Sequence, residues 1–192
     1  MLSPASLAGE RGKLLFRDQA AFPLAQQVRS SEGAPLGELF SFVSGLYFRG
    51  KLTYARAFGQ PPPGLSGVQI ISASEGLRSP DERVDLPRLR AWSGVEIDAG
   101  NPVFTEPLVE HAEELARAVG AQCRFVLLGS VATDKYVRPL AKVFGDWLLF
   151  PSDFVGRGDM SRGSILLKAA AAGRELDYVP VEGARRSNAR SG

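Results

Sequence analysis

The chain has 192 residues, of which 44% are hydrophobic and 23% are charged, and its formal net charge at pH 7 is +2. These values are ordinary for a globular protein, and no apolar stretch is long enough to cross a membrane. The single cysteine, Cys123, cannot form an internal disulfide. The N-terminus lacks the basic-then-apolar order of a signal peptide, so we expect a cytoplasmic protein. The mild positive charge permits nucleic-acid binding but does not argue for it.

Apolar side chains recur at helical spacing over residues 35–58. Ser44-Gly45 or Gly50 is expected to divide this segment into two helices. The prolines at 61–63 then end the helical pattern.

The rest of the chain alternates between apolar strands and helices. The expected strands cover 68–74, 123–130, 147–151 and 176–181. One short helix is expected after Pro87. Three further helices are expected over 105–120, over 136–145 and over 162–172. Thr105 is expected to cap the first of these three. Continuous apolar strands that alternate with helices predict an α/β fold, in which helices flank a mostly parallel sheet.

The domain organisation follows from the same pattern. We expect one α/β domain over residues 35–181. Residues 1–34 are expected to form an N-terminal arm, loose over 1–12, and a short helix. Residues 182–192 are rich in arginine and small residues and predict a disordered basic tail.

Three of the predicted strands end in polar segments that contain glycine. These segments cover 72–80, 129–136 and 151–163. Because ligands bind at the carboxyl ends of strands in such sheets, a site is expected where these segments meet.

The third segment contains "GRGDMSRG" (156–163), just before an expected helix. Its glycines permit close backbone approach, and the free N–H groups of a helix start attract anions. Arg157 and Arg162 can add bidentate contacts to phosphate oxygens. In the alternative interpretation, Asp159 or Ser161 caps the helix, Asp159 pairs with an arginine, and the glycines only shape a turn.

Aromatic and basic side chains alternate in the second expected helix. They are Tyr47, Phe48, Tyr54, Arg49, Lys51 and Arg56. Such a mixture can stack bases and hold phosphates. The spacing favours the alternative, a helix with an aromatic core face and a basic solvent face.

Few residues suit catalysis. The only histidine, His111, lies among glutamates and predicts a solvated helix face, so neither a histidine-based triad nor a multi-histidine metal site is expected. The carboxylates of Glu75, Asp153 and Asp159 lie in the polar segments. One of them could act as a base or stabilise an oxocarbenium ion during cleavage of an N-glycosidic bond. No metal or cofactor is expected.

Four motifs, in the same order, resemble the YaaA peroxide-stress family. They are "YFRGKLTYA" (47–55), "IISASEGLRSPDE" (70–82), "VLLGSVATDKYVRPL" (126–140) and "GRGDMSRGSIL" (156–166). The last motif is the most specific. Glu75 stands where the family prefers tyrosine, and Gly156 stands where alanine is usual. "LSPAS" near the start also echoes the family's opening Leu-Ser-Pro-Ala, but no strand precedes it.

The resemblance implies a YaaA-like α/β fold with a positively charged cleft, DNA binding, and protection of DNA from oxidative damage. The residues that match family motifs are Arg49, Gly50, Ser72, Gly76, Pro80, Ser130, Tyr136, Arg157, Gly158, Met160, Ser161 and Arg162. With Lys51 added, the residues expected to bind phosphate are Arg49, Lys51, Ser72, Ser130, Tyr136, Arg157, Gly158, Ser161 and Arg162.

The expected function is therefore that of a nucleic-acid- or nucleotide-binding protein with a role in the stress response. Two alternatives stay open. One is an enzyme that acts on the N-glycosidic bond of a nucleoside or base, and the other is a non-catalytic protein-interaction domain. The oligomeric state cannot be read from the sequence.

Overall fold

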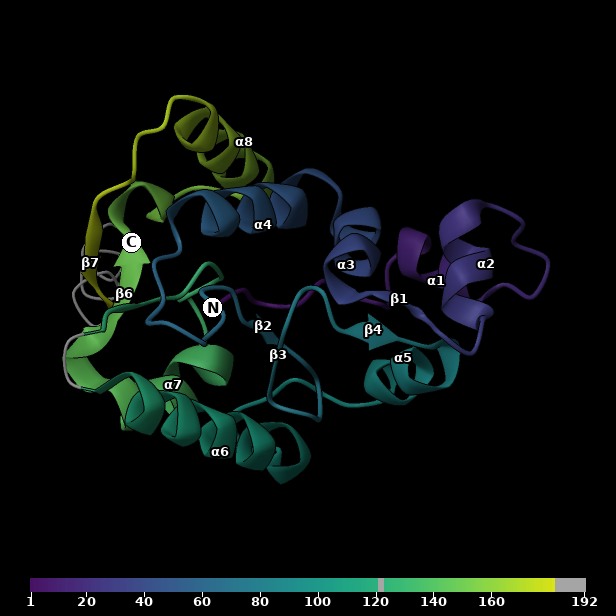
Figure 1. Cartoon of the computed structure of the whole chain (residues 1–192), viewed down its shortest axis with the longest axis horizontal. Helices are drawn as coiled ribbons and strands as arrows, with labels where there is room; N and C mark the ends of the chain where they lie inside the picture. The colour runs from purple at the N-terminus through teal and green to yellow at the C-terminus, as the bar shows by residue number, and fades with distance from the viewer. Residues whose placement is uncertain (121–122, 182–192) are drawn as a thin grey trace.

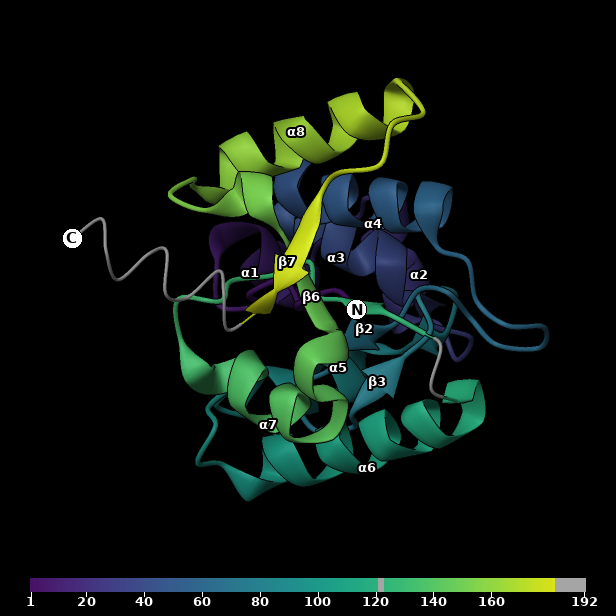
Figure 2. The same ribbon diagram turned by 90° about the vertical axis from the view of Figure 1, so that its left-hand side faces the viewer.

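Helices cover both sides of a thin layer of short strands (Figures 1 and 2). The computed structural model describes residues 1–120 and 123–181. Two helices lie on one side of the strands, and two lie on the other. They are α4 (Leu46–Phe58) and α8 (Asp159–Ala171), then α6 (Pro102–Val119) and α7 (Asp134–Phe144). The α/β class expected from the sequence is confirmed.

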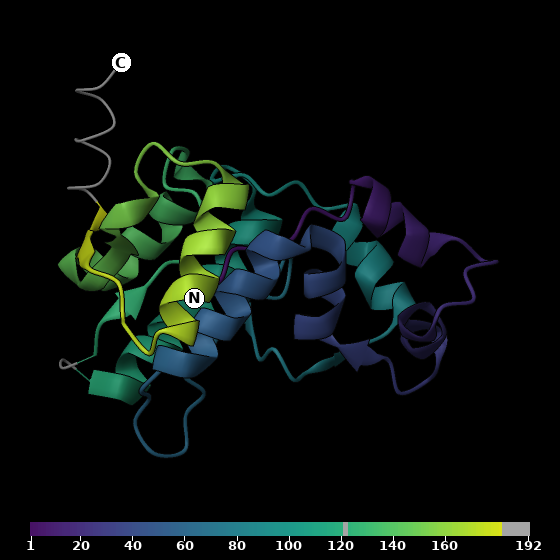
Figure 3. The same ribbon diagram turned by 90° about the horizontal axis from the view of Figure 1, so that it is seen from above.

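Four further helices gather at the other end of the long axis (Figures 1 and 3). They are α1 (Glu10–Phe16), α2 (Pro23–Arg29), α3 (Leu36–Ser44) and α5 (Leu86–Ser93). These helices enclose an apolar cluster that includes Leu15, Leu39 and Trp92. A second cluster lies between the α4–α8 and α6–α7 pairs and includes Leu108, Leu140 and Leu166.

The strands are short and form three small sheets. Two sheets are antiparallel pairs, β1 (Ala34–Pro35) with β4 (Arg83–Val84) and β2 (Ile70–Ile71) with β3 (Leu77–Arg78). The third sheet contains β5 (Phe125–Val126), β6 (Leu148–Pro151) and β7 (Tyr178–Pro180). In that sheet β5 and β6 are parallel, whereas β6 and β7 are antiparallel.

The expectation of a mostly parallel sheet is therefore wrong, and β2 shows one physical reason. The chain does not cross over to a helix after β2 but turns back at once into β3. In this turn the Ser72 N–H donates to the Gly76 carbonyl oxygen at 2.8 Å, and Gly76 has a φ of 68°. Glycine adopts this left-handed backbone without the penalty that a Cβ would add. The segment that we expected to be an open loop is thus a hairpin turn.

The first residues of the chain lie at the centre of the molecule. Leu2 forms parallel bridges with both Ile70 and Leu128, and its side chain is fully buried. The Leu2 N–H donates to the Gln69 carbonyl oxygen at 2.7 Å, and the Ser3 N–H donates to the Leu128 carbonyl oxygen at 3.1 Å. The expectation of a loose arm is wrong for this segment, because it connects the β2–β3 sheet to the strand region that contains β5.

Several helix boundaries differ from the expected ones because other residues provide the caps. Gly45, with a φ of 59°, separates α3 from α4, as one of the two expected breaks. The α6 helix begins at Pro102 rather than Thr105, because the Asn101 side chain accepts a hydrogen bond from the Val103 N–H at 3.1 Å. The α8 helix begins at Asp159, three residues before the expected start.

Two further expectations stay predictions. The basic tail over 182–192 lies outside the described residues, and the division of the chain into domains is not tested. Within the described residues, no helix is long and apolar enough to pass through a bilayer.

Candidate functional site

Helices α4 and α8 pack side by side through two glycines (Figure 3). A Cβ atom at Gly50 would lie 2.7 Å from the Gly163 carbonyl oxygen, and a Cβ atom at Gly163 would lie 2.9 Å from the Tyr47 Cα. Neither contact is possible for a real side chain, so the third glycine of "GRGDMSRG" serves helix packing. The close approach brings Tyr47 and Lys51 to the first turn of α8.

Lys51 is almost completely buried, although it is a charged residue type. Its Nζ atom donates to the Ser3 carbonyl oxygen at 2.6 Å and to Ser3 Oγ at 2.9 Å. The same nitrogen lies 4.6 Å from the ring centre of Tyr47 and 4.8 Å from that of Phe48. The segment around Ser3 approaches β5 closely too, because a Cβ atom at Gly129 would lie 2.8 Å from Ser3 Cβ.

Burial lowers the pKa of Lys51 to about 7, and the negative charge of Asp159 opposes this effect. Desolvation penalises the charged form of an amine, so the lysine loses its proton more easily than it would in water. Lys51 is therefore poised to change its protonation state near neutral pH. A perturbed pKa of this kind occurs often at functional sites.

The Tyr47 hydroxyl is the unusual polar group of this region. Tyr47 is 7% exposed, and its hydroxyl oxygen has no hydrogen-bond partner among the described residues. Burial raises the pKa of Tyr47 to about 12, whereas the Arg162 guanidinium, which lies close to the Tyr47 hydroxyl without the geometry of a hydrogen bond, lowers it. Leaving a buried hydroxyl unpaired costs free energy, so such a group needs an explanation.

The start of α8 is open to solvent. Gly158 is the N-cap residue, and no side chain caps the helix. A Cβ atom at Gly156 or Gly158 would have no neighbour within 4 Å. Arg157 is exposed and has no ion pair with any other described residue. The expectation that Asp159 caps the helix is wrong, because Asp159 is itself the first helical residue and its side chain is 70% exposed.

The Arg162 side chain connects α8 to the segment that precedes it. Its Nε and Nη2 atoms donate to the Phe154 carbonyl oxygen at 3.3 Å and 3.2 Å. The guanidinium is 3.9 Å from Asp159 Oδ1, which makes a loose ion pair. The arginine thus ties the segment before α8 to the helix.

We refer to Tyr47, Lys51, Tyr136, Asp159 and Arg162 as the α4–α8 site. Tyr136 belongs to this group because it lies in the same buried cluster as Tyr47, and burial, with Tyr47 as a smaller cause, raises its pKa. Four of these five residues were candidates from the sequence, with Tyr47 noted among the aromatic side chains.

Other candidates lie outside this group. Ser72 is fully buried, and its hydroxyl donates to the Gly76 carbonyl oxygen within the hairpin turn. The Ser130 hydroxyl accepts a hydrogen bond from the Ala132 N–H at 3.3 Å. Arg49 and Asp153 are exposed, and Ser161 is partly buried in the first turn of α8.

Glu75 is held in an ion-pair network and is a poor candidate for a catalytic base. Its carboxylate accepts hydrogen bonds from the Arg88 guanidinium and, at 2.9 Å, from Trp92 Nε1. These bonds, with the Arg88 contact as the larger cause, lower the pKa of Glu75. Glu82 pairs with the same arginine. The network joins the hairpin turn to α5.

His111 differs from its expected role on a solvated helix face. Its Nδ1 atom accepts a hydrogen bond from the Leu77 N–H at 3.1 Å, and the side chain is partly buried. The histidine therefore anchors β3 to α6. Among the described residues, no group of three or more histidine, cysteine, aspartate or glutamate side chains is arranged to hold a metal ion.

Ser3 is the functional neighbour that sequence analysis missed. Its only signal is the opening "LSPAS", which we set aside because no strand precedes it. In the structure this segment itself lies between strands, with Leu2 bridged on both sides. Comparisons with family models, curated proteins and solved structures found no match to this chain.

Proposed function

We propose that this protein binds a phosphate-bearing ligand, a nucleotide or a nucleic acid, at the α4–α8 site together with the neighbouring Arg157. The observation that carries the proposal is the buried Tyr47 hydroxyl, which has no partner among the described residues and lies beside the uncapped start of α8. A phosphate oxygen that reached this position would accept hydrogen bonds from the Tyr47 hydroxyl and from the free N–H groups of the helix.

The charges near the helix start also favour an anion. Arg157 and Arg162 stand where the helix dipole is positive, which is unfavourable for a cation unless an anion lies between them. Arg162 is positioned by its bonds to Phe154, whereas Arg157 is free to reach a ligand. An anion would also raise the pKa of Lys51 and so favour its protonated form.

The exposed carboxylate of Asp159 opposes an anion at the same place. Its side chain faces solvent and makes only a loose ion pair with Arg162. A bound phosphate would compete with Asp159 for that arginine. Because Asp159 repels an anion and competes with it for Arg162, we expect Asp159→Asn to strengthen ligand binding.

The order of motifs that resembles the YaaA family supports the same proposal. Two residues of the most specific motif, Arg157 and Gly158, lie at the open helix start. A role in protecting DNA under oxidative stress would follow if the ligand is DNA.

A binding titration with a labelled double-stranded DNA oligonucleotide and with a nucleoside triphosphate tests the proposal. We expect Arg157→Gln to weaken binding and, if DNA is the ligand, to reduce the slope of log affinity against log salt by about one. Arg174→Gln is the matched control, since Arg174 is exposed just beyond the other end of α8.

The three arginines at 185, 186 and 190 could bind DNA by themselves. A full-length variant with Arg185→Gln, Arg186→Gln and Arg190→Gln separates the two sources of affinity. If this variant loses all DNA binding while Arg157→Gln loses none, the α4–α8 site is not the DNA site. If neither ligand binds, the protein-interaction alternative gains support.

One observation favours a second candidate, an enzyme that cleaves an N-glycosidic bond. Lys51 titrates near neutrality, and Asp159 is the one of the three candidate carboxylates whose charge acts on it. The exposed carboxylate of Asp159, beside a neutral amine, can act as the general base that activates water. Incubation with nucleosides and with DNA, followed by chromatography of free bases, tests this reaction. Absence of base release from both substrates would eliminate it.

A further inference from the structure

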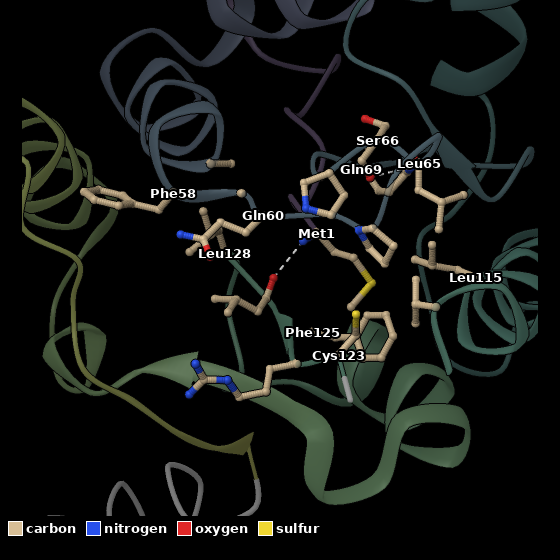
Figure 4. Close-up of a pocket in the computed structure, with 18 of the residues that line it drawn as sticks. Met1, Phe58, Gln60, Leu65, Ser66, Gln69, Leu115, Cys123, Phe125 and Leu128 are labelled. Carbon is tan, nitrogen blue, oxygen red and sulfur yellow. Dashed lines mark hydrogen bonds between the residues drawn. The ribbon is translucent and has the colours of Figure 1, made fainter. Parts of the chain in front are cut away.

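A separate pocket of about 330 Å³ lies at the opposite end of α4 from Tyr47 (Figure 4). Phe58 lines it from the end of α4, Leu115 from α6, and Phe125 from β5. Figure 4 shows Gln60 and Leu65 on the side of the loop that follows α4. Pockets of this size, lined by both apolar and polar groups, hold small molecules.

The loop wall is built by the chain's own turns. A Cβ atom at Gly67 would lie 3.3 Å from the carbonyl carbon of Gly59, so the two ends of the loop touch. Within the loop, the Leu65 N–H donates to the Pro62 carbonyl oxygen at 3.2 Å. A compact loop with adjoining ends, closed by glycines and stiffened by prolines, is an Ω-type loop. The pocket therefore exists before any ligand enters.

Two charged side chains line this pocket, and only one of them, Arg124, lacks a partner among the described residues. The Glu175 carboxylate accepts a hydrogen bond from the Tyr178 hydroxyl at 2.8 Å, and that hydroxyl is 2.6 Å from the Tyr54 hydroxyl. Arg124 is exposed and has neither a hydrogen bond nor an ion pair with another described residue.

We infer that this pocket binds a small amphipathic anion, with an aromatic body against the apolar walls and one acidic group paired with Arg124. The Phe125 ring and the Leu115 side chain, which lie near each other in Figure 4, provide the surface for an aromatic body. The carboxamide of Gln60, which is exposed at the loop, can orient polar atoms of the ligand. This site is independent of the phosphate site proposed at the start of α8.

Two fluorescent probes with the same ring system test the inference. Anilinonaphthalene sulfonate carries an acidic group, and phenylnaphthylamine lacks it. We expect the protein to bind one equivalent of each probe. Arg124→Gln should weaken sulfonate binding about tenfold, the loss typical of a charge-assisted hydrogen bond, and leave phenylnaphthylamine binding unchanged.

Two further variants locate the probes and control for general charge. Leu115→Trp should reduce binding of both probes, because the larger side chain fills the pocket. Arg17→Gln removes an exposed arginine at the end of α1 and should change neither affinity. Thermal melts of each variant show that the fold is kept.

The inference is overturned if Arg124→Gln changes neither affinity or changes both equally, since the acidic group would then have another partner. It is also overturned if a folded Leu115→Trp protein binds both probes as the wild type does. DNA and nucleotide binding should be unaffected by Arg124→Gln, so failure here leaves the proposed function standing.

Discussion

At the scale of single residues, two tyrosines on α4 form a matched pair. Both are buried, but the Tyr47 hydroxyl has no partner among the described residues, whereas the Tyr54 hydroxyl bonds the Tyr178 hydroxyl and accepts from the Leu176 N–H. Removing an unpaired buried hydroxyl relieves a cost, while removing a paired one leaves its partners unsatisfied.

We therefore expect Tyr47→Phe to raise the free energy of unfolding by about 1 kcal/mol and Tyr54→Phe to lower it by about 1 kcal/mol. Tyr47→Phe should also weaken binding of the nucleotide or DNA. Urea denaturation and the binding titration measure the two effects. A loss of stability in Tyr47→Phe with unchanged binding would show that the hydroxyl has a structural partner.

Lys51 predicts a pH dependence of stability. The pKa of Lys51 falls from 10.5 to about 7 on folding, so between these values the unfolded chain binds a proton that the folded protein does not. Stability then rises with pH, because raising the pH removes the proton that favours unfolding. We subtract the free energy of unfolding of Lys51→Met from that of the wild type. This difference should rise by about 1.4 kcal/mol per pH unit between pH 7 and 10.

Denaturation of both proteins in urea at several pH values checks this slope. The burial cost of the charge is fully present below about pH 7, where both states of the wild type hold the proton. Lys168→Met, which removes an exposed lysine of α8, is the control. An equal slope in wild type and Lys51→Met would mean that Lys51 stays charged in the folded protein.

At the scale of elements, the packing of α4 on α8 determines the site. Alanine usually stabilises a helix by up to about 1 kcal/mol relative to glycine. At Gly50 the added Cβ would instead lie 2.7 Å from the Gly163 carbonyl oxygen. The helices must separate, so we expect Gly50→Ala to lower the free energy of unfolding by about 1 to 3 kcal/mol.

Thermal or urea denaturation measures this loss. Gly94→Ala, at the end of α5, is the control, because its Cβ would lie 3.6 Å from the Ala91 carbonyl oxygen, an ordinary contact, and its φ of −87° suits any residue. We also expect Gly50→Ala to weaken ligand binding, since it moves α8 away from Tyr47 and Lys51. A fully stable Gly50→Ala protein would contradict the packing described here.

At the scale of the whole molecule, Leu2 connects two sheets. It is fully buried and bridged to Ile70 on one side and Leu128 on the other. We expect Leu2→Ala to lower the free energy of unfolding by about 2 to 5 kcal/mol, as for other large-to-small core changes. Leu14→Ala, at a partly exposed position of α1, should cost less than half as much. Equal effects in urea denaturation would restore the interpretation of a loose arm.

Features that depend on neighbouring residues could be predicted from the amino-acid sequence. The glycine at 45 marked a helix break, and the apolar periods of α6 and α7 marked those helices, because backbone preference and amphipathic pattern act over a few residues. Lys51, Asp159 and Arg162 were also selected from local motifs. Residue type was sufficient to select these candidates, because charge and hydrogen-bonding capacity are properties of the individual side chain.

Which of these residues lie close together, and how their protonation and hydrogen bonding change, depends on the folded chain. Glu75 is a poor candidate for a catalytic base because Arg88 and Trp92, which are distant in sequence, donate hydrogen bonds to its carboxylate. Gly163 became a packing residue because α4 lies against it. The lowered pKa of Lys51 depends on exclusion of water by segments from both ends of the chain. Desolvation is a property of the assembled core, so no local pattern contains it.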